Sequence, residues 1–351
     1  KIDLSDWKFP ITPREEWRQM FTDAWRMERD YFYDENMHGV DWDAMYERYL
    51  PLVDRVTTRN ELADLIGRFV GELSALHTSV RGGDTRSDKQ NISVAALGGQ
   101  FSRQADQNGY RIDYIYKTDP DYPDEKSPLD DPYLEIKEGD VITHVNGIST
   151  LEAVDLGELI REEAGNQVRL TLVRGGNSRD VIVTPVRSDY NLRYSDWEYG
   201  NRLKVEEASN DSIGYLHLRA MGSGDISQFY REFYPVFDRQ GLIIDVRYNF
   251  GGNIDSFILE KLLRKAWMYW KGRSGEPYWN MPYSFRGHIV ILVNENTYSD
   301  GEAFADGFKK LGLGTSIGMR TWGGEIWLNS ANRLSDNGLA RAPMFGVYGE
   351  N

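Results

Sequence analysis

The sequence predicts a multidomain α+β protein, and three observations along the chain support this fold class. Apolar residues first recur at three- and four-residue spacing, then come in short strand-like runs, and finally form apolar strands that alternate with helices. The chain has 351 residues, which at roughly 150 residues per domain leaves room for two or three domains. We therefore expect a helical cap domain at 1–83, a β domain at 84–190 and an α/β core at 191–351.

Composition and charge exclude several functions. The chain carries 41 Lys and Arg against 55 Asp and Glu, a net charge of −14, and it has no cysteine. The acidic balance argues against nucleic acid as the main partner, and the missing cysteine excludes disulfides and a cysteine nucleophile. No apolar run approaches the ~18 residues that span a membrane. We expect a cytoplasmic protein, or a periplasmic one if a signal peptide precedes Lys1.

The first 80 residues have the pattern of helices. One apolar stripe runs through 17–27 and a second through 62–73, which predicts a cap of about three helices. The last of these is expected to end at His77, just before a glycine-containing linker at 81–91. The aromatic residues near Trp25 and Phe32 are interpreted as core, with an aromatic binding surface as the alternative.

The middle of the chain is rich in short strands. Strand-like runs lie at 95–99, 110–115, 140–142, 168–173 and 181–183, with one helical run at 151–163. The phrase at 138–147 combines a turn, a buried strand and an Asn-Gly hairpin. This phrase, its helix and the strand that follows resemble the PDZ domain, a fold that binds a peptide end as an added strand. A small barrel without a ligand is the alternative.

The last third alternates apolar strands with helices. Strands are expected at 213–218, 241–246 and 288–293, and helices at 226–237, 256–269 and 299–311. This order predicts a mainly parallel sheet covered by helices on both faces. Functional residues in such folds lie at the carboxyl ends of the strands.

Two strand ends carry residues suited to catalysis. After 241–246 the chain reaches Gly251 and Gly252, and glycines permit a sharp turn whose amides can face an oxyanion. A plain strand-to-helix turn is the alternative. After 288–293 comes Ser299 at the start of a helix, where a hydroxyl lies near the positive end of the helix dipole and beside the amide of Asp300. An ordinary helix N-cap is the alternative.

A serine nucleophile needs a base within hydrogen-bonding reach. The sequence offers five histidines, namely His38, His77, His144, His217 and His288. His77 follows the cap helices and precedes the linker, so it can lean over another domain. His217 alternates with apolar neighbours in a strand, which favours a structural role.

The order of these segments resembles the tricorn and carboxyl-terminal processing serine peptidases. The segments are the cap ending in His77, the PDZ-like domain, Asp245–Gly252 and Asn294–Glu302. Two further phrases, at 17–21 and 320–324, resemble the tricorn branch. The resemblance implies a crotonase-like α/β core, a Ser299 nucleophile and a His77 base. It also implies an oxyanion hole made by the amides of Gly252 and Asp300, with Gly251 as the alternative glycine, and no metal or organic cofactor.

Two departures from the tricorn pattern concern the base. The family has a serine directly before the catalytic histidine, where this chain has Leu76; Ser74 and Thr78 are candidate substitutes. A late glutamate that helps to orient the site is matched by Glu350. The β-propellers that precede the tricorn cap and guide peptides are missing from this sequence, so we expect the catalytic half of a longer protein.

The implied function is a serine peptidase that cleaves peptides or unfolded polypeptide and assembles as a homo-oligomer. Two alternatives remain. A degenerate site would leave a PDZ-type peptide-binding scaffold, and a crotonase-like core also suits acyl-thioester chemistry, although no nucleotide-binding segment for coenzyme A is visible. Trp267, Trp270 and Trp279 are expected to line a pocket or to pack in the core or a subunit contact.

Overall fold

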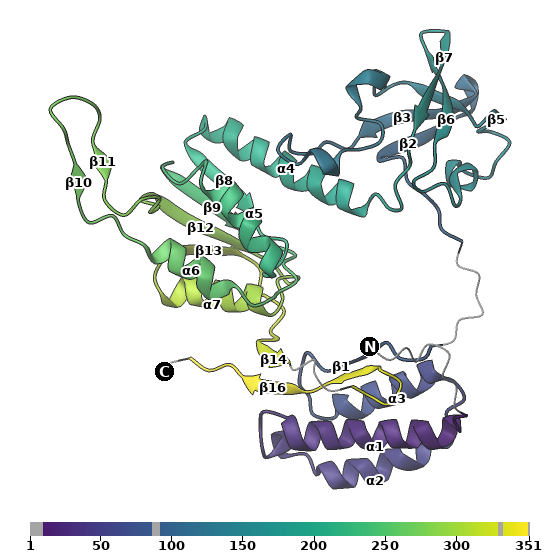
Figure 1. Cartoon of the computed structure of the whole chain (residues 1–351), viewed down its shortest axis with the longest axis vertical. Coiled ribbons are helices and arrows are strands. Elements are labelled where there is room, and N and C mark those ends of the chain that lie inside the picture. Colours follow the sequence, from purple (N-terminus) through teal and green to yellow (C-terminus); the bar gives the residue numbers. More distant parts are fainter. Residues whose placement is uncertain (1–9, 86–91, 329–332, 350–351) are drawn as a thin grey trace, which may run out of the picture. The chain divides into compact units, whose positions relative to one another are not determined.

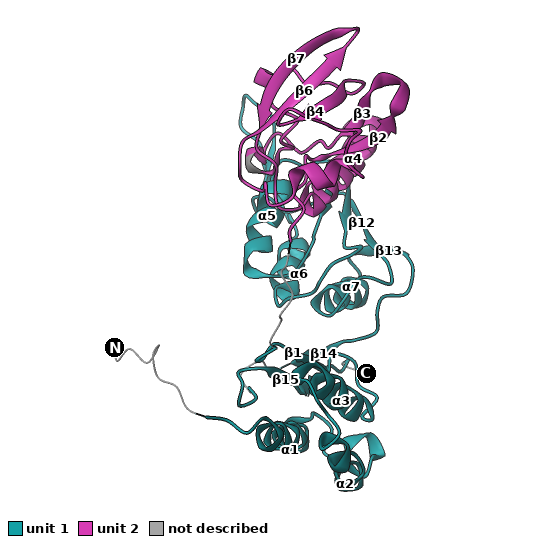
Figure 2. Cartoon of the chain, turned by 90° about the vertical axis from the view of Figure 1, so that its right-hand side faces the viewer, with its two compact units in different colours: residues 1–88, 216–351 teal, residues 89–215 magenta. Residues whose placement is uncertain are grey.

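The computed structural model describes residues 10–85, 92–328 and 333–349. The chain divides into two compact units, one formed by residues 1–88 with 216–351 and the other by residues 89–215 (Figure 2). The first unit holds the helical cap and the α/β core, and the second holds the β domain. The helical region, the PDZ-like domain and the α/β core predicted from the sequence are confirmed. None of the described helices is long and apolar enough to cross a membrane.

The cap consists of three helices, α1 (Pro13–Tyr31), α2 (Trp42–Val53) and α3 (Arg59–Gly71), with the 3₁₀ turn η1 (Met37–Gly39) between the first two (Figure 1). Asp41 caps α2 and Thr58 caps α3, each accepting a hydrogen bond from an N–H in the first turn. Their apolar faces share one core that includes Phe21, Leu62 and Phe69. The helix predicted to end at His77 ends at Gly71 instead.

Segments from the end of the chain complete this cap. Strand β1 (Ser79–Arg81) pairs antiparallel with β15 (Leu339–Arg341), and β14 (Ile326–Leu328) pairs with β16 (Pro343–Gly346). Leu334 and Ala340 belong to the buried core of the helices. A buried ion pair of 2.5 Å joins Arg59 on α3 to Asp336, and both side chains are at most 5% exposed. Residues from both ends of the sequence therefore form one cap.

The β domain is an antiparallel sheet in the order β2-β3-β4-β6-β7. The bounds of these strands are β2 (Gly99–Gln104), β3 (Gly109–Ile115), β4 (Val141–Val145), β6 (Val168–Arg174) and β7 (Asn177–Val183). A short β5 (Ile148–Ser149) pairs with β4 through the predicted hairpin, where Asn146 and Gly147 both have positive φ. The helical run expected at 151–163 is only the 3₁₀ helix η5 (Leu156–Ile160). Three further 3₁₀ turns are η2 (Ala105–Gln107), η3 (Pro123–Glu125) and η4 (Pro132–Leu134).

A long helix that the sequence reading did not predict, α4 (Tyr190–Ser209), leads to the core sheet. This sheet has the order β13-β12-β9-β8, and β12 runs parallel to both β9 and β13. Its strands are β8 (Ile213–His217), β9 (Gly241–Asp245), β12 (His288–Val293) and β13 (Gly314–Gly318), and its helices are α5 (Ser223–Phe233), α6 (Asp255–Leu263) and α7 (Asp300–Lys310). Buried aromatic residues of α5 and α7 pack in its core with Ile244 and Ile291.

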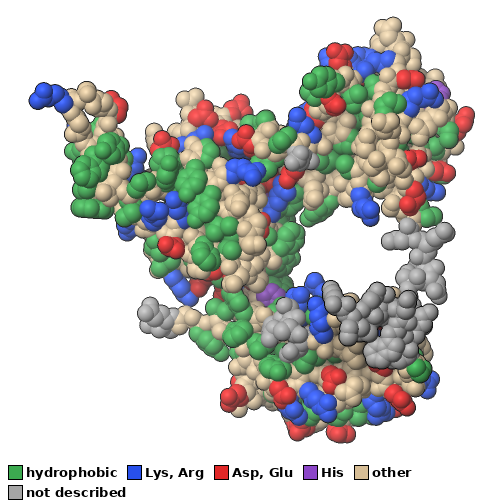
Figure 3. Space-filling model, in the orientation of Figure 1, with side chains coloured by type: hydrophobic (Ala, Val, Ile, Leu, Met, Phe, Trp, Pro, Cys, Tyr) green, Lys and Arg blue, Asp and Glu red, His purple; other side chains and the backbone are tan. Residues whose placement is uncertain are grey.

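Helix α6 ends at Leu263, six residues before the predicted end. The chain then forms the hairpin of β10 (Tyr269–Trp270) and β11 (Tyr278–Trp279), which extends away from the core sheet in Figure 1. Hydrophobic side chains gather on this hairpin in Figure 3. Trp267, Trp270 and Tyr278 are each more than half exposed, so these aromatic residues do not belong to the core of the chain.

Candidate active site

Ser299 lies on a strained turn between β12 and α7. Its φ of 53° and ψ of −120° are sparsely populated for a residue with a side chain. The Glu302 N–H donates to the Ser299 carbonyl at 2.7 Å, and the Ser299 N–H donates to the Glu302 carboxylate at 3.1 Å. These two bonds fix the backbone conformation of the turn between β12 and α7. An abrupt turn of this kind presents the serine hydroxyl at the carboxyl end of a parallel strand.

The glycine turn after β9 lies directly against Ser299. Gly251 has φ of +77°, and a Cβ atom there would lie 2.6 Å from Ser299 Cβ and 3.2 Å from the Asp300 nitrogen. A Cβ on Gly252 would lie 1.9 Å from the Met221 carbonyl oxygen. Both positions therefore require glycine, one for its backbone conformation and contact with Ser299, the other for its close approach to the chain after β8.

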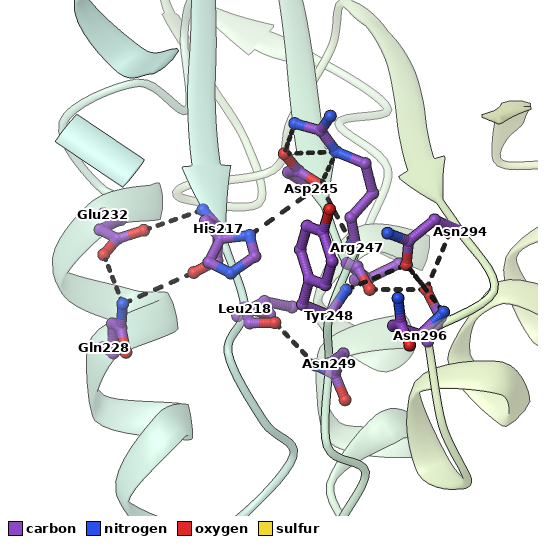
Figure 4. Close-up of polar contacts among 12 residues, drawn as sticks. His217, Leu218, Gln228, Glu232, Asp245, Arg247, Tyr248, Asn249, Asn294 and Asn296 are labelled. Carbon is purple, nitrogen blue, oxygen red and sulfur yellow. Dashed lines mark hydrogen bonds and ion pairs between the residues drawn. The ribbon is translucent and has the colours of Figure 1, made fainter. Parts of the chain in front are cut away.

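Asn249 fixes the glycine turn from within (Figure 4). Its side chain is fully buried, its Nδ2 donates to the Leu218 carbonyl at 2.7 Å, and its Oδ1 accepts the Gly251 N–H at 2.8 Å. Its own carbonyl accepts the N–H of Tyr298, the residue before Ser299, at 2.9 Å. One asparagine thus joins the end of β8, the glycine turn and the serine turn.

Two further contacts join the ends of β9 and β12. The Thr297 hydroxyl donates to the Val246 carbonyl at 2.8 Å, and Asn294 Oδ1 accepts the Tyr248 N–H at 3.1 Å (Figure 4). Buried polar side chains that are fully bonded in this way rigidify their surroundings. The serine and glycine turns therefore form one rigid unit.

His77 follows α3 with φ of +71°. Its Nδ1 lies 2.7 Å from the Ile326 carbonyl oxygen, and because a carbonyl only accepts, Nδ1 carries the proton in the neutral ring. Nε2 is then the basic nitrogen. Burial lowers the pKa of His77, while the hydrogen bond to Ile326 and the nearby Glu302 carboxylate act in the opposite direction. The neutral form that a general base requires is therefore favoured near pH 7.

Trp322 connects the histidine to the serine turn. Its ring meets His77 edge-on at a centroid distance of 4.9 Å and Tyr298 at 5.1 Å. The main-chain N–H of Trp322 donates to the Thr297 carbonyl at 3.2 Å. The Glu302 carboxylate, which bonds the Ser299 N–H, also accepts the N–H groups of Gly323 and Gly324. The loop at 320–324 therefore packs against the serine turn on one side and His77 on the other.

The sequence-predicted residues fall into two groups. The structure places Ser299, Asp300, Gly251 and Gly252 together in one packed region, and it places His77 against Trp322 beside that region. Glu350 lies outside the described residues. Sequence reasoning assigned no role to Asn249, Glu302 or the Ile326 carbonyl. The Ser-x-x-Glu spacing of Ser299 and Glu302 is a capping-box signal that points to Glu302.

His217 is buried and structural in character. It lies 3.9 Å from Asp245 at the end of β9, and both side chains are fully buried (Figure 4). Burial lowers the pKa of His217 to about 4, so the ring is neutral near pH 7. The Glu232 carboxylate on α5 accepts the backbone N–H of His217 at 3.3 Å. No cluster of His, Asp and Glu that could hold a metal ion occurs among the described residues.

A strained serine turn, a neighbouring glycine turn and a half-buried neutral histidine lie together on a parallel-sheet core. With the fold, they define a candidate active site of the kind that serine hydrolases use. Family models extend this result along the chain. The tricorn protease C1 domain matches residues 13–71, the tricorn protease PDZ domain matches 95–188, and peptidase family S41 matches 212–351. The chain therefore combines two tricorn-type domains with a peptidase family S41 domain.

Individual relatives agree with this assignment. The putative tricorn-like protease C-terminal subunit of Sulfurisphaera tokodaii is 36% identical over 348 residues, covering 99% of this chain and 40% of that protein. The tricorn protease of Thermoplasma acidophilum is 34% identical, covering 95% of this chain and 31% of that protein. A crystal structure of the tricorn protease superposes with a TM-score of 0.90 at 33% identity, over 97% of this chain and 33% of that one. The chain thus spans less than half the length of these relatives.

Proposed function

We propose that this chain hydrolyses peptide bonds in peptides or unfolded polypeptide by serine acyl-enzyme chemistry. The observation that carries the proposal is the packing of the strained Ser299 turn against a glycine turn, with His77 linked to the serine turn through Trp322. The domains are assigned accordingly. The cap at 1–83 contributes the base, the PDZ-like domain at 84–190 contributes peptide binding, and the core at 191–351 contributes the nucleophile.

Each reacting group has one role. Ser299 Oγ attacks the scissile carbonyl carbon while its proton passes to His77 Nε2. The carbon–nitrogen bond then breaks, and the leaving amine takes this proton from Nε2, which leaves an acyl-Ser299 ester. Water attacks the ester by the same route, with His77 Nε2 again accepting and returning a proton. The products are a free carboxylate, a free amine and the regenerated hydroxyl.

Gly252 rather than Gly251 supplies the glycine donor of the oxyanion hole. The Gly251 N–H already donates to Asn249 Oδ1 at 2.8 Å. The bridge between Met221 and Gly252 uses the Gly251 carbonyl and the Asn253 N–H, so it leaves the Gly252 N–H unused. Within the described residues, the N–H groups of Gly252 and Asp300 have no acceptor. These two amides can therefore bind the developing negative charge, and losing one such donor typically costs about 10²–10³ in rate.

The Ile326 carbonyl orients the base where the family uses a serine side chain. Leu76 precedes His77 and is 42% exposed, and the Thr78 hydroxyl donates to the Ala75 carbonyl instead. The 2.7 Å contact between His77 Nδ1 and the Ile326 carbonyl fixes the tautomer that a base requires. This contact supports an active site despite the Leu76 departure. Glu350 remains the candidate for a further orienting carboxylate.

The partners and the assembly follow from the surfaces and the charge. Peptides or unfolded proteins are the proposed substrates, and the net charge of −14 favours cationic ones. The exposed aromatic hairpin β10–β11 is the proposed contact of a homo-oligomer, because exposed apolar patches of this kind mark interaction sites. No metal or organic cofactor takes part in the proposed reaction. The cytoplasm is the proposed compartment.

The decisive test uses a fluorophosphonate probe and a library of fluorogenic peptides. We expect the probe to label Ser299, and Ser299→Ala to lose labelling and at least 10³-fold of the peptide cleavage. Ser274→Ala, an exposed serine in the β10–β11 loop, is the matched control and should behave as the parent chain. Cleavage that survives Ser299→Ala would refute the assignment. Peptide binding without turnover, unchanged by Ser299→Ala, would favour the scaffold alternative.

A further inference from the structure

Asp300 is a buried acid whose side chain the proposed reaction does not use. It is the first residue of α7 and has no exposed surface. Its Oδ2 accepts the N–H of Ile254 at 2.7 Å and that of Asp255 at 3.1 Å. Its Oδ1 is buried without a hydrogen-bond partner among the described residues. A carboxyl group in this setting is costly to bury, so the position calls for an explanation.

The two contacts of Oδ2 cap helix α6 from outside. Residues that cap their own helix have a side-chain oxygen, usually Ser, Thr, Asp or Asn. The residue at this position in α6 is Ile254, whose side chain cannot accept a hydrogen bond. The cap is therefore delivered by a residue 46 positions away in sequence. A local cap would be simpler if helix stability were its only purpose.

The geometric result of this cap is a link between the two halves of the oxyanion hole. The Asp300 N–H is one proposed donor. Its carboxyl group bonds the N–H groups of Ile254 and Asp255. Ile254 lies two residues after Gly252, whose N–H is the other proposed donor. One residue thus carries one proposed donor on its main chain and bonds, through its side chain, the segment that follows the other donor.

We infer that the Asp300 side chain is a positioning group that sets the spacing of the Gly252 and Asp300 amides for the transition state. This inference rests on the proposed function. It assigns no contact with substrate to the carboxyl group. A misplacement of about 1 Å in a catalytic group can cost 10²-fold in rate, so loss of this brace should lower kcat while leaving substrate binding intact.

Asp300→Ala and Asp300→Asn separate the effect of the hydrogen bonds to Ile254 and Asp255 from the effect of the charge. The amide oxygen of asparagine can still accept from Ile254 and Asp255, so Asp300→Asn should stay within about fivefold of the parent kcat. Asp300→Ala should lose about 10²-fold in kcat with KM unchanged within a factor of three. Asp306→Ala and Asp306→Asn make the same changes at an exposed position six residues further along α7 and should change neither constant.

Inhibitor affinities exclude a merely structural role. A peptide aldehyde, which forms an oxyanion on Ser299, should bind about 10²-fold more weakly to Asp300→Ala, whereas the corresponding peptide amide should bind equally well to both proteins. If Asp300→Ala does not fold, Asp300→Ser replaces it. The serine hydroxyl is one bond shorter than the aspartate side chain, so it does not reach the Ile254 N–H. A parent-like kcat in Asp300→Ala or Asp300→Ser, or equal weakening of both inhibitors, would overturn this inference and leave the proposed function standing. A parent chain that neither cleaves peptides nor reacts with fluorophosphonate would overturn the proposed function and the inference with it.

Discussion

His77 shows how main-chain geometry at a single residue sets its chemistry. His77 has a positive φ in the segment that follows α3. Its Nδ1 bonds the Ile326 carbonyl, so Nε2 is the nitrogen that can accept a proton. Burial is the largest influence on its pKa and favours the neutral ring. The same features that place His77, the proposed base, therefore favour its neutral form near pH 7.

This environment predicts a specific pH dependence. The pKa of His77 is lowered from 6.5, and only the neutral ring can accept the proton from Ser299. The value of kcat/KM should therefore fall on the acid side with an apparent pKa below 6.5. The measurement is kcat/KM for a fluorogenic peptide between pH 4.5 and 9, with circular dichroism at each pH to exclude unfolding. An acid limb centred well above 6.5 would contradict the assignment of His77 as base.

The residues that sequence alone could identify are those with distinctive side chains at strand ends. Ser299, Gly251 and Gly252 could be proposed from the sequence because they follow apolar strands, and the resemblance of the whole ordered set of segments favoured catalysis over an N-cap or a plain turn. The acceptor for His77 could not be proposed in this way, since a main-chain carbonyl is present in every residue and Ile326 reads only as an apolar strand residue. Asn249 was equally hidden, because its bonds to Leu218 and Gly251 depend on strands brought together by folding.

At the scale of elements, the apolar pattern predicted strands better than helices. Strands β6, β9 and β12 lie within a residue or so of the expected bounds, because each buries at least alternate residues of its apolar run. Helix α6 ends early, where a run of aromatic residues that suited a helix forms the β10–β11 hairpin. Helix α4 was missed because its 20 residues have no clear apolar face. Periodicity fails where an element does not present one face to one core.

Helix α1 contains a buried acid that should weaken the cap at high pH. Glu28 is 1% exposed, its Oε2 has no partner within the described residues, and burial raises its pKa to about 8. The folded state therefore binds this proton more tightly than the unfolded chain. The resulting stabilisation is complete below pH 4.5 and is lost as the pH rises to about 8.

Replacing Glu28 by glutamine should remove this loss of stability at high pH. Glu28→Gln should raise the free energy of unfolding at pH 8.5 by a few kcal/mol relative to its effect at pH 5, since each pKa unit corresponds to about 1.4 kcal/mol. Urea unfolding followed by circular dichroism at both pH values measures the difference. Glu15→Gln, an exposed change in the same helix, is the control. An equal effect of Glu28→Gln at both pH values would show that Glu28 is ionised in the folded protein.

At the scale of the whole molecule, the β10–β11 hairpin and Trp267 beside it expose large aromatic side chains. Trp267 and Trp270 are 69% and 51% exposed. Replacing both by glutamate should shift the protein from an oligomer to a monomer, because two charges would have to be buried in the contact. Light scattering coupled to size exclusion at micromolar concentration gives the mass. Tyr133→Glu, at a residue that is 95% exposed in the β domain, should leave the oligomer intact. A parent chain that is already monomeric would refute the hairpin proposal.

The completion of the cap by β14, β15 and β16 also governs when the proposed base can be aligned during synthesis. His77 and the carbonyl that orients it are 249 residues apart in sequence, and β15, which pairs with β1, comes later still. A ribosome releases the cap helices long before these partners exist. The proposed nucleophile and base are therefore both synthesised before the strands that align them. Under the proposed function, the base is therefore aligned only after translation has passed β14 and β15.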